Sequence, residues 1–207
     1  MERAEEFPLF PLRLVALPSE LVPLHIFEER YKTMFERCLG TPTEFGIVCV
    51  ADDGLKPIGC SCEVVEVLER FDDGRINLVA RGTRPFRIVE RVEHLPYPAG
   101  TVDFLSDHDE VVDRPSLEEA HGVYAELVER ATDREPDRSE IDAMGAYEMA
   151  ATVDFGVDAK QGLLDLRSET ARLRLLTRLM RAAIKRLEFA ERMQERARSN
   201  GRMRFGV

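Results

Sequence analysis

In the first hundred residues, apolar side chains come in short runs or alternate with polar ones, a pattern typical of β-strands. Pro8, Pro11 and Pro18 interrupt the earliest segments. Because proline has no N–H to donate to a ladder, this favours edge or irregular strands there. Many short strands favour a barrel or a strongly curved sheet over alternating strands and helices. The segments expected to be extended are 7–10, 14–17, 45–50, 58–71, 76–80, 86–89 and 101–104.

The longest of these segments, 58–71, has apolar residues on one face before Val64 and on the opposite face after it. A bulge or bend near Val64 reconciles the two halves. Asp73 and Gly74 then mark a tight hairpin turn into the next strand.

The four cysteines include no pair with Cys-x-x-Cys spacing, so neither a zinc site nor a redox motif is indicated. Cys60 and Cys62 lie two residues apart in an expected strand, so both point to one face. We interpret them, with Cys38 and Cys49, as small apolar core residues of a cytoplasmic protein, where thiols stay reduced. The lack of a signal-like amino terminus and of an apolar run of roughly 18 residues favours the same location and predicts no membrane partner.

Helical periodicity occurs once among the expected strands and then dominates beyond about residue 106. Apolar residues at three- and four-residue spacing predict a helix over 25–39, with Gly40 where a C-terminal cap is expected. Asp158 and Ser168 are suitable N-caps, and residues 199–201 are expected to end the last helix. The later helical segments expected are 117–131, 141–155, a short turn after Asp158, and 168–198.

The chain of 207 residues is acidic overall, with a formal charge of −10, but its charge is unevenly distributed. Residues 1–160 carry 17 basic and 34 acidic side chains, whereas residues 161–207 carry 12 basic and 5 acidic ones. An arginine-rich helix is able to contact nucleic acid or anionic lipid. However, the larger acidic body repels polyanions, so we expect the basic segment to face that body or a protein partner.

The sequence lacks the motifs of two common catalytic sites. None of its lysines follows a glycine, which excludes a Gly-Lys-Ser/Thr phosphate loop. No serine lies in a Gly-x-Ser-x-Gly elbow. Spacing alone leaves a serine–lysine dyad open, but no glycine-flanked serine lies at an evident strand–helix turn. We predict no catalytic residue, no metal and no cofactor.

Several charged residues are interpreted as structural. The run Asp-His-Asp-Glu at 107–110 contains metal-ligand residue types, but consecutive residues rarely converge on one ion, so we expect a solvated acidic loop. His25 is interpreted as a capping or packing residue. Glu28 and Arg30 are too close in sequence to pair on one helical face, so we expect each to pair with the strands. A solvated or salt-bridged face is expected at Arg81, Arg84 and Arg87.

An ordered set of motifs over nearly the whole chain resembles the amino-terminal substrate-binding domain of the Lon protease family. The motifs are FPLFPL at 7–12, PLHIFEERY at 23–31, FGIV at 45–48, IG at 58–59, DGR at 73–75, GTRPFRI at 82–88, KQGLLD at 160–165 and RL at 172–173. The chain departs from the family pattern at Ser19, Glu29 and Pro85, which affects local turns and one salt bridge. The family's ATPase and peptidase modules have no counterpart in this sequence.

The resemblance implies an α+β fold: a PUA-like β pseudo-barrel with one embedded helix, followed by an α-helical bundle. We expect the barrel to span residues 1–110 and the bundle 111–207. The resemblance also implies a module that recognises exposed apolar segments of polypeptides and cuts nothing itself.

Our leading interpretation is a stand-alone domain of this type that binds a polypeptide substrate or a protein partner. Binding is expected at an apolar patch rimmed by charge or at an unpaired strand edge. Two alternatives stay open, an RNA or small-ligand reader of the PUA-like type and an enzyme with an unrecognised hydrolytic site. The candidate binding residues, for which core packing is the alternative interpretation, are Leu24, Phe27, Arg30, Tyr31 and Phe86.

Overall fold

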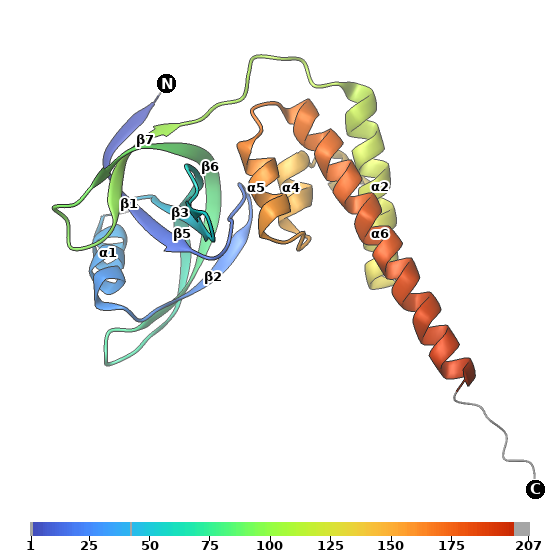
Figure 1. Cartoon of the computed structure of the whole chain (residues 1–207), viewed down its shortest axis with the longest axis horizontal. Helices are drawn as coiled ribbons and strands as arrows, with labels where there is room; N and C mark the ends of the chain where they lie inside the picture. The colour runs from blue at the N-terminus through green and yellow to red at the C-terminus, as the bar shows by residue number, and fades with distance from the viewer. Residues whose placement is uncertain (1, 42, 201–207) are drawn as a thin grey trace, which may run out of the picture.

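The computed structural model describes residues 2–41 and 43–200, and it places a curled β-sheet beside a group of helices (Figure 1). The sheet and one helix come from the first half of the chain, and the other helices follow, which confirms the α+β class. The strands are β1 (Arg3–Leu12), β2 (Leu21–Ile26), β3 (Phe45–Ala51), β4 (Gly54–Leu55), β5 (Ile58–Arg70), β6 (Ile76–Val92) and β7 (Ala99–Phe104). The helices are α1 (Glu29–Gly40), α2 (Arg114–Thr132), α3 (Arg138–Asp142), α4 (Ala146–Ala151), α5 (Val157–Asp165) and α6 (Glu169–Asn200).

The sheet closes because β1 changes partner along its length. The order around the barrel is β1, β7, β6, β5 and β3, and β3 returns to β1 as a parallel neighbour. The part of β1 up to Pro8 pairs with β7, and the part from Leu9 onward pairs with β3. The expectation that Pro8 and Pro11 suit an edge or irregular strand is confirmed for β1, because each of its two parts has one partner strand and its register with β7 shifts between Ala4 and Phe7. The Leu9 N–H donates to the Pro98 carbonyl, on the β7 side of β1. Because residues two apart in a strand point the same way, the nitrogen of Pro11 also faces this side. Strand β7 does not extend as far as Pro11, so the missing N–H of this proline costs no ladder hydrogen bond.

The long strand β6 corrects the prediction of two separate strands over 76–80 and 86–89. It runs unbroken for 17 residues. Along one side it pairs with β5, and along the other it pairs first with β2 and then with β7. Gly82 lies at this change-over, where an added Cβ would lie 2.1 Å from the Leu17 carbonyl oxygen. The break in the apolar pattern of β6 at Gly82 therefore reflects the close approach of the segment around Leu17 to this strand. Leu17 itself belongs to no strand.

The predicted bulge, hairpin and buried cysteines are confirmed. The register between β5 and β6 shifts between Val64 and Glu66. The two strands are joined by a turn in which Gly74 has a φ of +82°, a conformation that favours glycine. All four cysteines are buried free thiols.

The embedded helix α1 begins at Glu29, four residues later than predicted, because His25 and Ile26 belong to β2. In β2 the buried residues Val22, Leu24 and Ile26 alternate with exposed neighbours, which is the period of two of a strand. In the sequence alone, Ile26 also fits as the first apolar position of the helical spacing that continues in α1, which obscures this period. The helix continues through Gly40. Its buried face packs onto the barrel core through edge-to-face contacts of aromatic side chains from α1, β1 and β3, namely Tyr31, Phe35, Phe10 and Phe45.

The helical half differs from prediction in two places. Instead of one helix over 141–155, α3 and α4 are separated at Gly145, which is extended and has low helix propensity. The N-cap of α5 is Gly156 and not Asp158. Ser168 caps α6 as predicted, since its Oγ accepts the Ala171 N–H at 3.1 Å. Helix α6 reaches Asn200, and the predicted stop at Gly201 lies outside the described residues.

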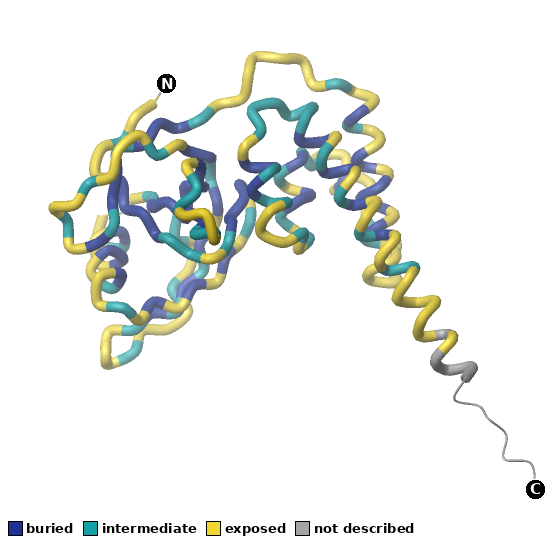
Figure 2. Tube along the Cα trace, viewed as in Figure 1, coloured by how far each residue is buried: buried dark blue, intermediate teal, exposed yellow. Residues whose placement is uncertain are grey.

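Barrel and helices share one hydrophobic cluster, which extends from Phe10 in β1 to Ile184 in α6. Buried positions accordingly continue from the sheet into α4, α5 and the first half of α6, whereas α6 beyond Ile184 is exposed or intermediate at every position whose burial is described (Figure 2). A connector from Leu105 to Asp113 joins β7 to α2. The division into residues 1–110 and 111–207 stays a prediction. Among the described residues, no helix is both long and apolar enough to cross a membrane.

Candidate binding site

The five predicted binding residues do not form one site. Leu24 lies on the inner face of β2, and Phe86 is fully buried in a second cluster. The Phe86 ring fills the space above Gly46 and Gly59, where an added Cβ would lie 2.4 Å and 2.8 Å from it. Leu24 and Phe86 are therefore core residues, the alternative that the sequence had left open.

Phe27 is exposed, at 58%, and directly follows β2, whose exposed residues alternate with buried ones and lie on the outer side of the sheet. Its ring stacks on His25, which hydrogen-bonds Asn77 at 2.6 Å. Leu21 at the other end of β2 and Leu68 on the β5 bulge are 60% and 56% exposed. We call this set the outer sheet surface; its large exposed members are Leu21, Phe27, Val65 and Leu68.

Strand β2 also has a free edge. Within the described residues it pairs with β6 alone. The Gly82 N–H donates to the Glu20 carbonyl, so in this antiparallel ladder the backbone groups of Leu21, Pro23 and His25 point away from β6. A groove of about 460 Å³ separates this edge from the start of α5, and Leu21, Pro23 and Val157 line it.

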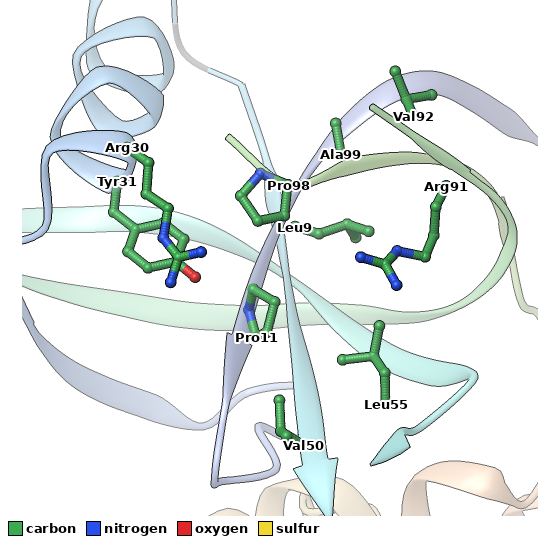
Figure 3. Close-up of a pocket in the computed structure, with 10 residues that line it drawn as sticks. All are labelled: Leu9, Pro11, Arg30, Tyr31, Val50, Leu55, Arg91, Val92, Pro98 and Ala99. Carbon is green, nitrogen blue, oxygen red and sulfur yellow. The ribbon is translucent and has the colours of Figure 1, made fainter. Parts of the chain in front are cut away.

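Arg30 and Tyr31 line a different cavity, which lies beside β1 between α1 and the β6–β7 end of the barrel (Figure 3). The Arg30 guanidinium lies 4.5 Å from the centre of the Tyr31 ring. It also donates from Nε to Glu28 Oε2 at 2.9 Å. The prediction that Glu28 and Arg30 pair separately with strands is therefore wrong. Glu28 is the extended N-cap of α1, and helical spacing does not apply to it.

The cavity has a volume of about 310 Å³ and combines apolar walls with a second arginine. Arg91, on β6, points into it from the side opposite Arg30 (Figure 3). None of the residues lining the cavity is acidic. Within the described part of the chain, no hydrogen bond or ion pair joins Arg91 to another side chain. The apolar walls include Leu9, Pro11, Leu55, Val92, Pro98 and Ala99.

Sequence reasoning missed Arg91 and most of the cavity walls. Arg87 and Arg91 both lie in a stretch of β6 that mixes charged and apolar residues without a regular period, so no local signal separates the two. Only the pairing of β6 with β7, which sets Arg91 opposite Gly100, carries it towards α1. The predicted salt-bridged face is confirmed for Arg81 and Arg84, which pair with Glu63 and with both Glu2 and Glu44.

Two residues of the acidic run at 107–110, Asp107 and Glu110, accept hydrogen bonds that attach the connector to the start of α6. Asp107 and Glu169 both accept hydrogen bonds from Arg172, which is 3% exposed. Although burial opposes ionisation of Asp107, the hydrogen bond from Arg172 lowers its pKa. Glu110 accepts a hydrogen bond from Ser168. Among the described residues, no group of three or more potential ligand side chains is placed to hold a metal ion.

Three comparisons with known proteins agree on the kind of domain. Residues 6–182 match the family model of the ATP-dependent protease La (LON) substrate-binding domain. Lon protease 1 of Syntrophobacter fumaroxidans is 24% identical over 92% of the chain, which spans 25% of that protein. The fold is similar to a Lon N-terminal domain protein from Xanthomonas campestris, with a TM-score of 0.64, 24% identity, and coverage of 85% of this chain and 97% of the other. It is also similar to the N-terminal domain of Mycobacterium avium complex Lon protease, with a TM-score of 0.66, 18% identity, and coverage of 86% and 98%.

Proposed function

Since the chain belongs to the family of Lon substrate-binding domains, we propose that it recognises polypeptide segments through the outer sheet surface and the free edge of β2. It binds without making or breaking covalent bonds. The proposal applies to this domain alone, because the chain spans only a quarter of the curated relative.

The observation that carries the proposal is the coincidence of exposed apolar side chains with an unpaired strand edge. An extended peptide gains main-chain hydrogen bonds by adding to a free edge, and it gains specificity from side chains that enter neighbouring grooves. The edge at Leu21 and Pro23 borders the groove beside α5, and Phe27 lies just beyond the end of the same strand. Together these features suit an extended segment with apolar residues.

The arrangement of charge does not favour the RNA-binding alternative. Arg172, Arg174 and Arg181 of the basic helix α6 all pair with carboxylates of the connector, α2 or α6 itself. These pairs reduce the positive field that a polyanion would meet. RNA binding at low salt that weakens steeply as salt rises would nevertheless support that alternative.

Isothermal titration with a reduced, carboxymethylated polypeptide, which stays unfolded, tests the proposal. We expect saturable binding by the parent chain and binding about tenfold weaker for Leu21→Glu or Phe27→Glu, because each places a charge where an apolar contact forms. Val111→Glu is the matched control, since Val111 is 96% exposed but lies in the connector. Absence of binding, or equal loss in all three variants, would contradict the proposal.

A further inference from the structure

We propose that the cavity lined by Arg30 and Arg91 binds the carboxyl terminus of a polypeptide whose last residue is apolar. The inference rests on the proposed function, and it names a second site and a specific chemical group that this site recognises. The evidence lies in the charge, the shape and the unsatisfied donors of the cavity.

The two guanidiniums are positioned for an anion. Arg30 is held by its stacking on Tyr31 and by the bond from its Nε to Glu28. Its Nη2 also lies 2.8 Å from Glu28 Oε2, which leaves donors of Nη1 available. Arg91 enters from the other side without a partner among the described side chains. One carboxylate against two guanidiniums leaves this rim net positive.

This positive rim stands out against the rest of the chain. Residues 1–160 carry twice as many acidic as basic side chains, yet no acid lines the cavity. A ligand carboxylate is complementary to such a rim, and a guanidinium binds it with two parallel hydrogen bonds.

Because the cavity walls are apolar, a ligand that fits them carries an apolar group in addition to its anionic group. Leu9, Leu55 and Val92 offer nothing to a free inorganic ion. Ligand cavities commonly measure roughly 300–1,000 Å³, so a volume of about 310 Å³ suits one terminal side chain better than a long acyl chain. In a polypeptide, the last residue carries a free carboxylate and a side chain on the same carbon atom. This matches the pairing of cationic rim and apolar wall.

The test uses two fluorescent peptides that end in Leu-Leu and differ only in the terminal group, a free carboxylate or a carboxamide. Fluorescence anisotropy at low salt should show the acid binding at least tenfold more tightly than the amide, since the carboxamide cannot form the charge-assisted hydrogen bonds that a carboxylate accepts from guanidinium groups. Arg91→Gln should remove most of that difference. Arg87→Gln, which changes another exposed arginine of β6 away from the cavity, should preserve it.

Several outcomes separate this inference from the proposed function. If the unfolded polypeptide binds but the acid and amide peptides bind equally, the inference is overturned and the proposed function stands. If the unfolded polypeptide and both peptides fail to bind, both fail. An acid preference that Arg91→Gln leaves intact overturns the assignment to this cavity. Arg91-dependent binding of octanoate without any acid preference among the peptides overturns the chain-end ligand. Unchanged urea midpoints of both variants show that any loss is local.

Discussion

Arginine has different roles in the helical half of the chain and at the cavity of the barrel. Where the connector meets the helices, Arg172 is buried, donates to Asp107 and Glu169 and to the Leu166 carbonyl, and lies 4.4 Å from the centre of the Tyr147 ring. At the cavity, Arg91 is exposed and has no partner among the described residues. A guanidinium whose donors are satisfied within the chain stabilises the fold, whereas one with unused donors is available to a ligand.

The same contrast extends to the other ion pairs. Lys160 and Glu20 join α5 to the barrel with both side chains 14% exposed, whereas Arg114 and Glu118 on α2 are 87% and 68% exposed. Solvent screens the exposed pair, so its contribution to stability is small. Burial, more than the presence of an ion pair, therefore separates structural charges from the rest.

Replacement of Arg172 should have the largest effect. Arg172→Met leaves the carboxylates of Asp107 and Glu169 close together without their cation, and loss of one partner of a buried pair costs about 3–5 kcal/mol. Urea unfolding measures this loss. The matched control is Arg178→Met on the exposed side of α6, which should change stability by less than about 0.5 kcal/mol. Equal effects of the two substitutions would remove the distinction between the two kinds of arginine.

Glu20→Gln should destabilise the chain by about 1–3 kcal/mol, because Glu20 accepts both the Leu17 N–H, at 3.0 Å, and the Lys160 ammonium. Thermal unfolding followed by circular dichroism is a suitable measurement. Glu118→Gln on α2 is the exposed counterpart, and it should shift stability by at most about 0.5 kcal/mol. A larger effect at Glu118 would show that burial does not decide the contribution.

The Asp107–Arg172 pair should also produce a pH dependence. Because the hydrogen bond from Arg172 lowers the pKa of Asp107 in the folded state, the stabilisation is present above the ordinary pKa of about 3.9 and is lost as the pH falls through the folded-state value. Urea unfolding between about pH 2 and pH 6 should therefore show a weaker decline on acidification in Asp107→Asn. Asp109→Asn, in the same connector, should keep the parental decline; an unchanged profile in Asp107→Asn would refute the assignment.

Arg91→Met should have the smallest effect on stability, within about 0.5 kcal/mol of the parent, because the side chain is exposed and has no partner in the described part of the chain. Chemical unfolding checks this directly. A loss above about 1 kcal/mol would show that Arg91 holds the barrel together, and the contrast with Arg172 would then disappear.

Much of the local structure followed from the sequence. The alternation of Ile76, Leu78 and Ala80 predicted a half-buried strand, and Asp73-Gly74 predicted the turn before it, because both signals act within a few residues. The break between α3 and α4 at Gly145 was missed, since a single glycine inside an apolar pattern is also compatible with a continuous helix.

The candidate site was only half predictable. Arg30 and Tyr31 were singled out in the sequence, and both line the cavity. Leu24 and Phe86 were singled out for similar reasons and are core residues. Arg91 went unnoticed because its difference from Arg87 lies in what surrounds it in space.

The amino-acid sequence by itself determined the α+β class, most of the strands and helices, the burial of the cysteines and the family, because these depend on periodicity and on motifs within short segments. The tertiary structure alone decided that β1 closes the barrel on β3, that Arg172 is satisfied and that Arg91 faces Arg30 across a cavity. These features arise from pairing between strands and helices distant in the chain. Packing sets which polar groups are paired and which stay available to a ligand, and no local pattern records that choice.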